Sequence, residues 1–304
     1  MAESSTTAEY ISDLKSFGQE VFVTSSGEAW VRHERYALQR IPTTLLTEPD
    51  DVDIRFLFEN SRSLLLSYSV AASEESGANA KLYTIADTQY HSRHLSKSTR
   101  KNLKYAENRL AFCEIPITKL ESIGFEAFRD TRQRAGLNDG TIASFRRQIS
   151  SYKAIRGYRI FGAFIDDKLA AFCKALVVNS VAEIAIYSAS DYLKTCCNEF
   201  IVYQSCSTLL TNPSVNLISF GLSSVQSSQS DGGLDRFKTR MGFQSTPIIR
   251  RFRLNPKFWW LNSRIVRGTV SSFAAIFSKN RGLQKAAGVL RLITIGATYD
   301  HETR

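Results

Sequence analysis

Four basic residues on one predicted helix form a candidate binding site for an anion. The segment HSRHLSKSTRKNLKYAENR, residues 91–109, offers Ser96 as an N-cap and Leu103 and Tyr105 as packing residues. Cations along one helix attract polyanions, so we expect an anionic ligand such as a phosphate, a pyrophosphate-linked precursor or tRNA. The cluster consists of Lys97, Arg100, Lys101 and Lys104. The alternative is a solvated basic face without a ligand.

Groups that could handle a proton follow a predicted strand in the second half of the chain. A carboxylate or phenol at Asp191 or Tyr187 could accept or relay a proton, although helix capping and aromatic packing are the structural alternatives. The adjacent thiols of Cys196 and Cys197 suggest a nucleophile. No histidine lies in residues 106–299, so a Cys–His couple would need a partner from the front half, and covalent thiol catalysis is disfavoured.

Hydrophobic periodicity predicts the elements that would position these residues. Strands are predicted at residues 158–165, 169–178, 181–188 and 215–220, and helices at 118–135, 141–153, 202–210 and 233–242. Asp166-Asp167 has the composition of a hairpin turn between the first two of these strands. Shorter strands are predicted at 21–24, 29–32, 36–41, 64–70 and 82–85, with a helix from Asp50 to Asn60. The order indicates an α/β fold.

This order of elements resembles the GNAT acyltransferase fold, a mixed sheet flanked by helices. More narrowly, GLDRFKTRMGF (residues 233–243) is similar to the G-x-x-x-F-K-x-x-F-G signature of Fem-type acyl- and aminoacyltransferases. LSKSTRKNLKYAE (residues 95–107) resembles the L-S-K-x-x-R-x-N-x-x-x-A-E segment of Fem-like proteins. The resemblance covers roughly residues 82–254. The front part resembles the degenerate first half of tandem GNAT proteins.

The resemblance implies where an acyl donor and its chemistry would lie. Strand 181–188 would hold the donor, and residues 215–221 would form its splayed neighbour. Lys238 would stabilise negative charge on the acyl oxygen during attack by an amine, with Tyr187 or Asp191 handling the proton. Composition alone favours a surface lysine at position 238. The predicted donor-binding residues are Lys194, Thr195, Asn198, Ser188, Gly221 and Arg236.

One departure from the GNAT pattern concerns the choice of donor. Acyl-CoA-dependent members carry [QR]-x-x-G-x-[GA] after the donor strand, where N–H groups at a helix N-terminus receive the pyrophosphate. The matching window here is residues 194–199, with Cys197 and Glu199 at the two small positions. Glu199 would oppose a pyrophosphate by charge and bulk. The window therefore argues against acyl-CoA and leaves an acyl carrier or aminoacyl-tRNA as donor, or a loop that has lost donor binding.

Positive charge is concentrated near the C-terminus. Residues 255–304 carry +6 of the total of +10, and residues 255–299 contain seven Lys/Arg and no acid. Apolar residues of 258–277 fall on one helical face after Trp259-Trp260, so we expect residues 256–294 to bind an anionic membrane surface. The two arginines within 258–277 argue against a membrane-spanning helix. The alternative is a helix that docks on the GNAT core.

Cysteine use and the N-terminus favour a cytoplasmic protein, peripheral at the inner face of the membrane if the basic segment binds there. The five cysteines show no C-x-x-C spacing, so we expect reduced thiols and no metal site. The first fifteen residues contain acids and no apolar signal segment. We expect a partial GNAT-like half at 1–107, a GNAT core at 108–254 and basic amphipathic helices at 255–304.

The sequence thus predicts transfer of an acyl or aminoacyl group to an amine acceptor. The resemblance suggests a cell-envelope or polysaccharide precursor as acceptor. Two alternatives stay open: an acyl-CoA-dependent N-acetyltransferase of small molecules, and a non-catalytic GNAT-like binding module at a membrane surface. No bound cofactor and no DNA partner are expected.

Overall fold

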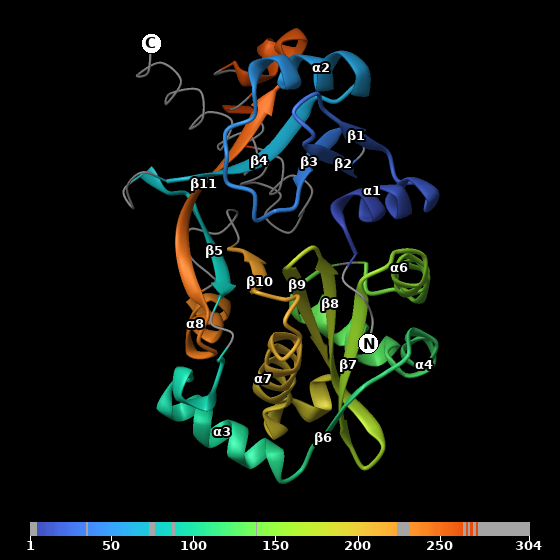
Figure 1. Cartoon of the computed structure of the whole chain (residues 1–304), viewed down its shortest axis with the longest axis vertical. Helices are drawn as coiled ribbons and strands as arrows, with labels where there is room; N and C mark the ends of the chain where they lie inside the picture. Colours follow the sequence, from blue (N-terminus) through green and yellow to red (C-terminus); the bar gives the residue numbers. More distant parts are fainter. Residues whose placement is uncertain are drawn as a thin grey trace. The chain divides into compact units, whose positions relative to one another are not determined.

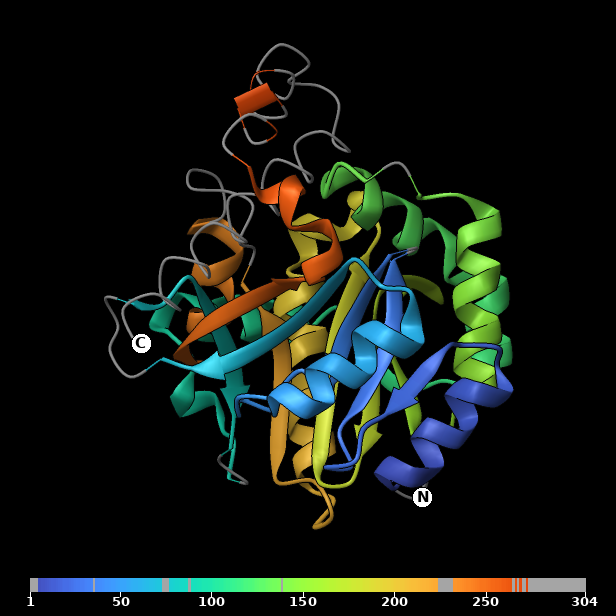
Figure 2. The same cartoon turned by 90° about the horizontal axis from the view of Figure 1, so that it is seen from above.

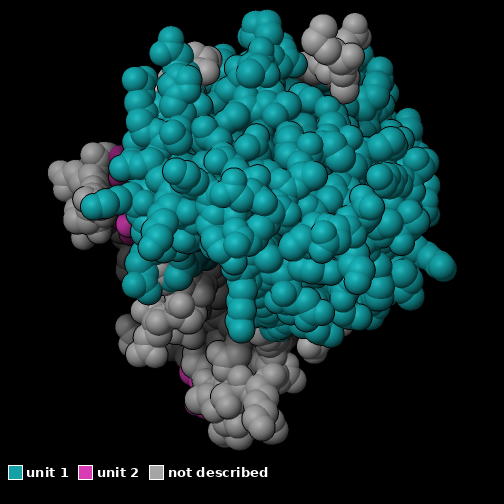
Figure 3. Space-filling view, turned by 90° about the horizontal axis from the view of Figure 1, so that it is seen from below, with its two compact units in different colours: residues 1–18, 83–221, 233–245 teal, residues 19–82, 222–232, 246–304 magenta. Residues whose placement is uncertain are grey.

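The chain folds into two compact units whose residues interleave along the sequence. The computed structural model describes residues 5–34, 36–72, 77–86, 89–137, 139–223, 232–263, 266, 268, 269 and 272. Unit 1 comprises residues 1–18, 83–221 and 233–245, and unit 2 comprises residues 19–82, 222–232 and 246–304 (Figure 3). Strands β5 (Ala80–Ile85), β10 (Leu217–Leu222) and β11 (Gln244–Leu254) contribute residues to both units. The predicted division at 107/108 and 254/255 stays a prediction.

Unit 1 is built around a mixed sheet with the strand order β5-β10-β9-β8-β7-β6. Its strands are β5 (Ala80–Ile85), β6 (Ala111–Glu114), β7 (Tyr158–Ile165), β8 (Lys168–Val178), β9 (Val181–Ser188) and β10 (Leu217–Leu222). Strands β6 to β9 pair antiparallel, and β10 is parallel to β9. Asp166 and Asp167 both have positive φ, 47° and 61°, which confirms the predicted hairpin turn. Strand β6 was not predicted, because its four residues are too few to show a period.

Helices cover both faces of this sheet (Figure 1). Helix α7 (Cys197–Leu210) packs on one face, and α3 (Lys97–Glu107) packs against α7; together they bury residues such as Leu103, Ile201 and Cys206. Helices α4 (Ile117–Ile123), α5 (Phe125–Arg134) and α6 (Ile142–Ala154) share a second core with Phe128, Phe145 and Phe172. Helix α1 (Thr7–Ser16) is held by ion pairs from Arg156 to Glu9 and Asp13. Both cores are apolar, so the sheet is stabilised mainly by burial.

The predicted single helix at 118–135 is wrong, because the chain breaks it at Gly124. Gly124 ends α4, and its N–H donates to the carbonyl of Leu120 at 2.7 Å before α5 begins at Phe125. A Cβ at Gly124 would lie 2.6 Å from Leu120 Cδ1. The bend therefore requires a residue without a side chain, and hydrophobic periodicity alone does not reveal such a requirement.

The strands of unit 2 follow one another in the order β1-β2-β3-β4-β11. They are β1 (Val21–Val23), β2 (Ala29–Glu34), β3 (Ala37–Ile41), β4 (Leu65–Ala71) and β11 (Gln244–Leu254). Helix α2 (Asp51–Ser61) lies across one face and buries Leu57 against Trp30 and Leu66 (Figure 2). Asp50 caps α2 by accepting a hydrogen bond from the Val52 N–H at 2.8 Å, as predicted.

After β11 the chain forms a short 3-10 segment, η4 (Pro256–Asn262). Most of the predicted membrane-binding segment, residues 256–294, lies outside the described residues. Within the part of the chain that the structure describes, no helix has both the length and the hydrophobicity needed to cross a bilayer.

Candidate functional site

The segment GLDRFKTRMGF forms helix α8 (Gly232–Arg240) and its C-terminal cap. The Phe243 N–H donates to the Lys238 carbonyl, and the Gly242 N–H donates to the Thr239 carbonyl, at 3.1 and 3.0 Å. With Gly242 at φ +86°, these two bonds form a Schellman motif, and Gly242 ends the helix as predicted. The Tyr90 hydroxyl donates to the Met241 carbonyl at 2.6 Å and anchors the cap.

We expect Gly242→Ala to lower the free energy of unfolding by about 1–3 kcal/mol. Alanine at this position would have to adopt a left-handed backbone conformation, and its Cβ would crowd neighbouring atoms. A Cβ there would lie 3.2 Å from the His94 carbonyl oxygen and from Tyr90 Cε2. Urea denaturation measures the change. Gly27→Ala is the control, since Gly27 also has positive φ but a Cβ there meets nothing within 4 Å. Equal losses in the two variants would show that backbone strain alone matters.

The side chain of Lys238 is buried, with an exposed fraction of 2%. Its Nζ lies 4.6 Å from the ring centroid of Tyr83 and 5.2 Å from that of Phe220. Burial lowers the pKa of Lys238 to about 8, and the nearby Asp235 partly opposes this effect. The lysine is therefore a core residue held between aromatic rings, and the sequence-based alternative of a surface lysine is wrong.

Asp235 and Tyr83 complete a polar cluster around this lysine. Asp235 lies one helical turn before Lys238 on α8, and the Tyr83 hydroxyl donates a hydrogen bond to its carboxylate. Burial, together with this carboxylate, raises the pKa of Tyr83 to about 12, so its phenol stays protonated at neutral pH. Tyr83 is itself buried. The cluster thus contains a cation, a carboxylate and a neutral phenol.

The cluster lies where strands β9 and β10 separate. The two parallel strands pair through only three residues each, from Leu217↔Val181 to Ser219↔Glu183. Phe220, whose ring lies under the Lys238 ammonium, is the first β10 residue after this paired segment. Gly221 follows with φ +72°. A splayed strand pair of this kind exposes backbone groups of both strands to a ligand.

The far end of β9 is fixed by α5. The Arg134 guanidinium donates to both the carbonyl and the hydroxyl oxygen of Ser188 at 2.7 Å, and the Ser188 N–H donates to Thr131 Oγ1 at 2.8 Å.

Tyr187 is buried and stacks on Phe172 at 4.7 Å, and burial raises its pKa. Asp191 is exposed within the 3-10 helix η3 (Ser190–Thr195), whose N-cap is Ala189. The catalytic roles suggested for Tyr187 and Asp191 stay predictions.

The predicted donor loop leads directly into α7. Cys196, with φ +60°, precedes the helix, so Asn198 and Glu199 lie in its first turn, and Lys194 is exposed just before it. The Glu199 carboxylate accepts a hydrogen bond from Asn102 of α3 at 3.1 Å. The side-chain oxygen of Asn198 is buried without a hydrogen-bond partner among the described residues. The carboxylate therefore stands at the helix terminus where an anion would otherwise bind.

The thiols of this loop are poorly suited to act as nucleophiles. Burial raises the pKa of Cys196, and it raises the pKa of Cys197 to about 11. The thiolate, which is the reactive form, is therefore scarce at neutral pH. Thr195 uses its hydroxyl to donate to the Tyr192 carbonyl at 2.6 Å.

Helix α3 presents the predicted basic cluster at the surface. Ser96 caps the helix by accepting from the Thr99 N–H, as predicted, and Lys97, Lys101 and Lys104 are exposed. Arg100 has a structural contact, because its guanidinium donates to the Leu95 carbonyl at 2.8 Å. Tyr105, predicted to pack, is instead 42% exposed on the basic face. The Arg109 guanidinium carbon lies over the Tyr105 ring, 3.8 Å from its centroid.

The sequence-based prediction of the site missed Tyr83, Asp235 and Asn102. Asp235 could have been found, since it stands three residues before Lys238 on the same predicted helix. Tyr83 and Asn102 come from segments far away in the sequence, and no local pattern marks them. Arg236 is exposed on α8, outside the buried cluster.

Solved structures of other proteins share this fold. FemX aligns with a TM-score of 0.57 at 9% identity, covering 80% of this chain and 89% of FemX. The C-terminal domain of a protein from Agrobacterium fabrum assigned as a lysylphosphatidylglycerol synthetase aligns with a TM-score of 0.55 at 14% identity, covering 83% and 88%. L-PGS from Bacillus licheniformis aligns with a TM-score of 0.51 at 10% identity, covering 82% and 92%.

No family model and no curated protein sequence matches the chain. At identities this low the likeness concerns the fold alone. The chain shares the fold of FemX and of the two phosphatidylglycerol-synthetase-type structures, and this likeness confirms the predicted Fem-like α/β fold.

Proposed function

We propose that the protein transfers an acyl or aminoacyl group from an activated donor to an amine acceptor. The observation that supports this most directly is the burial of Lys238 at the point where β9 and β10 separate. Burying an ammonium carries a desolvation cost, which the nearby Asp235 carboxylate offsets in part. Within GLDRFKTRMGF (residues 233–243), Lys238 is the residue that combines burial, positive charge and a lowered pKa.

The chemistry follows from the cluster. The amine nitrogen attacks the donor's carbonyl carbon, and a new C–N bond forms while negative charge develops on the carbonyl oxygen. The Lys238 ammonium stabilises that charge, and the aromatic walls keep the local dielectric low. The bond to the donor's leaving group then breaks, and the amine's proton passes to a base. Asp235 is the carboxylate within the cluster, while Tyr83 stays protonated and can donate.

The surroundings of α7 favour a polyanionic donor other than acyl-CoA. The Asn102–Glu199 hydrogen bond joins α3, which also carries the exposed lysines, to the first turn of α7. A carboxylate at that turn opposes a pyrophosphate, whereas a row of lysines attracts an extended phosphate backbone. Aminoacyl-tRNA or a charged acyl carrier fits both features.

For the acceptor, we propose an amine on a cell-envelope precursor, reached at the inner face of the membrane. Residues 255–299 with seven basic residues and no acid would supply attachment to an anionic surface. One structural neighbour has a name that pairs a lysyl group with phosphatidylglycerol, which is consistent with aminoacyl transfer near lipid.

A donor screen tests the proposal. The full chain is incubated with acetyl-CoA, longer acyl-CoAs, acyl carrier protein and charged tRNA, together with a panel of amines, and products are identified by mass spectrometry. Transfer from charged tRNA or acyl carrier protein is the expected result. Transfer from acyl-CoA alone would favour a small-molecule N-acetyltransferase. Donor binding without any turnover would favour a non-catalytic binding module.

We expect free CoA and acetyl-CoA to bind weakly or not at all, because the Glu199 carboxylate holds the position that a pyrophosphate would need. Titration calorimetry on the full chain measures this directly. In Glu199→Gln the charge is removed while the hydrogen bond from Asn102 can persist, so any residual CoA binding should strengthen. A low-micromolar dissociation constant for the wild type would mean that the loop is a functional CoA site.

A further inference from the structure

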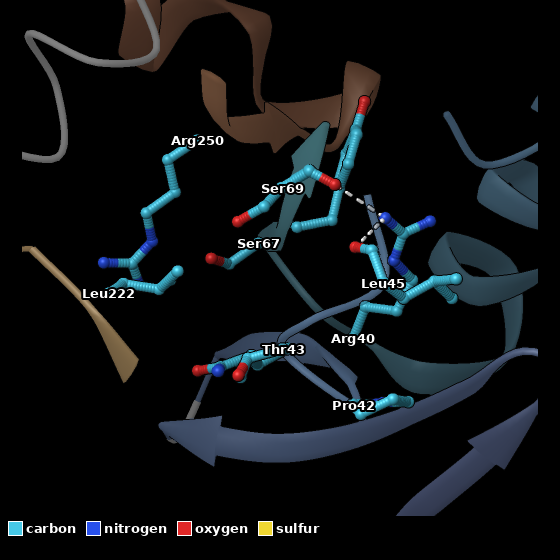
Figure 4. Close-up of a pocket in the computed structure, with 10 residues that line it drawn as sticks. Arg40, Pro42, Thr43, Leu45, Ser67, Ser69, Leu222 and Arg250 are labelled. Carbon is cyan, nitrogen blue, oxygen red and sulfur yellow. Dashed lines mark hydrogen bonds between the residues drawn. The ribbon is translucent and has the colours of Figure 1, made fainter. Parts of the chain in front are cut away.

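A small polar pocket lies in unit 2, beside strands β3, β4 and β11. It is lined by Gln39, Arg40, Pro42, Thr43, Leu45, Ser67, Tyr68, Ser69, Leu222 and Arg250 (Figure 4). Its volume of about 10 Å³ gives room for one water-sized group. Figure 4 shows the hydroxyls of Ser67 and Ser69 pointing to the side of the pocket where the Arg250 guanidinium lies. None of the described residues that line the pocket is acidic.

Arg250 differs from the other arginines of this sheet. Its neighbours on β11 pair with acids, Arg251 with Glu48 at 3.5 Å and Arg253 with Asp51 at 2.9 Å. For Arg250, burial lowers the pKa, and no carboxylate opposes this effect. Within the part of the chain that the structure describes, the contact found for its guanidinium is the ring of Phe252, 5.2 Å away. A desolvated cation without a counter-charge is unfavourable.

Arg40, the second arginine of the pocket, has its charge and donors already engaged. Its Nη1 pairs with Glu28 at 3.1 Å. Its Nη2 donates to the carbonyls of Leu45, Thr47 and Ser69, two of which are drawn in Figure 4. Among the described residues, the positive charge of the pocket that has no carboxylate partner therefore belongs to Arg250.

The backbone of Arg250 is fixed so that its side chain faces the two serines. The side-chain amide of Asn79 makes two hydrogen bonds with the Arg250 backbone. Asn79 Oδ1 accepts from the Arg250 N–H at 2.7 Å, and Asn79 Nδ2 donates to the Arg250 carbonyl at 2.9 Å. In the antiparallel pairing of β4 with β11, Arg250 stands opposite Ser69, and Phe252 opposite Ser67. Directly opposed residues project from the same face, which explains why the guanidinium and both hydroxyls meet there.

We propose that this pocket is a binding site for a phosphoryl group, with Arg250 as its cation and Ser67 and Ser69 as hydroxyl donors. One phosphate oxygen enters the pocket, and the other oxygens and the rest of the ligand stay at its mouth. A guanidinium and two hydroxyls converge on one point, and phosphate supplies enough acceptor oxygens for all of them. The phosphoryl group belongs either to a soluble phosphate ester or to a lipid headgroup. The assignment does not depend on acyl transfer, and it can fail or succeed independently.

The test compares three full-length proteins: wild type, Arg250→Gln and the matched control Arg251→Gln. Calorimetric titration with inorganic phosphate and with glycerol 3-phosphate, and thermal unfolding with and without each, are the measurements. We expect the wild type and Arg251→Gln to bind and to be stabilised, and Arg250→Gln to bind at least tenfold more weakly. Without ligand, Arg250→Gln should be no less stable than the wild type, because the variant removes a desolvated charge.

Binding to nanodiscs containing phosphatidylglycerol distinguishes the source of the phosphoryl group. A greater Arg250-dependent affinity for nanodiscs than for glycerol 3-phosphate assigns the site to a lipid headgroup, and the reverse order assigns it to a soluble ester. The proposal is overturned if the wild type shows no saturable binding to any of these probes. Equal binding by the wild type and Arg250→Gln to all of them would also overturn it.

Discussion

Lys238→Ala is expected to lower the rate of acyl transfer by a factor of about 10²–10³, the usual effect of removing one group that stabilises a developing oxyanion. The ammonium lies between the rings of Tyr83 and Phe220, where water cannot replace it. Since its charge acts on the transition state more than on the bound substrate, kcat should fall and KM should change little. Steady-state kinetics with the donor and acceptor found by screening measures both.

The control for this experiment is Arg240→Ala, which removes an exposed cation from the same helix. It should keep the wild-type rate. Circular dichroism and thermal unfolding establish that both variants are folded, and Lys238→Met, which preserves the volume of the side chain, excludes a cavity effect. A Lys238→Ala protein that turns over at the wild-type rate would refute the assignment. A loss confined to KM would make Lys238 a binding residue.

Most elements of the fold could be predicted from the sequence, because each has a strong local pattern. The hairpin at Asp166-Asp167, the cap at Ser96 and the end of α8 at Gly242 all depend on residues whose backbone preferences are nearly unambiguous. The break at Gly124 could not be predicted in the same way. Glycine is compatible with a helix, and only the contact with Leu120 shows why the chain turns there.

The site was less predictable than the fold, since its properties arise from burial and from distant contacts. The residue pattern around Lys238 predicts an amphipathic helix, and a lysine on such a helix normally faces solvent. Tyr83, on β5, encloses that lysine, and its place in the sequence gives no hint of the contact. Glu199 could be predicted to obstruct an anion, but its hydrogen bond with Asn102 required the packing of α3 on α7.

Lys238→Met is expected to raise the free energy of unfolding at pH 7, even though it removes activity. The pKa of Lys238 is about 8 in the folded protein against an ordinary value of 10.5. This difference corresponds to about 3 kcal/mol of unfavourable free energy for holding the protonated side chain in the core. Methionine has a similar shape, suits an apolar site and requires no charge to be desolvated. The attraction between Lys238 and Asp235 is already included in this difference, because the carboxylate raises the pKa while burial lowers it.

The dependence of this gain on pH identifies its cause. Below pH 8 both the folded and the unfolded states hold the proton on Lys238, so the full cost of burying the charge is present. Between pH 8 and 10.5 the unfolded state binds more protons than the folded state, so wild-type stability rises with pH through this interval. The advantage of Lys238→Met should therefore be largest below pH 8 and should disappear as the pH approaches 10.5.

Urea denaturation of the wild type and Lys238→Met at pH 7 and pH 10 measures this dependence. Lys168→Met is the control, because Lys168 is an exposed lysine at the start of β8 and should give no comparable gain at either pH. A gain for Lys238→Met that is equal at the two pH values would show that apolar packing, rather than charge, is responsible. A loss of stability at pH 7 would show that the Lys238 ammonium strengthens the folded state through its partners. The cation would then be part of the structural core, and its burial would no longer indicate a site whose charge is reserved for a reaction.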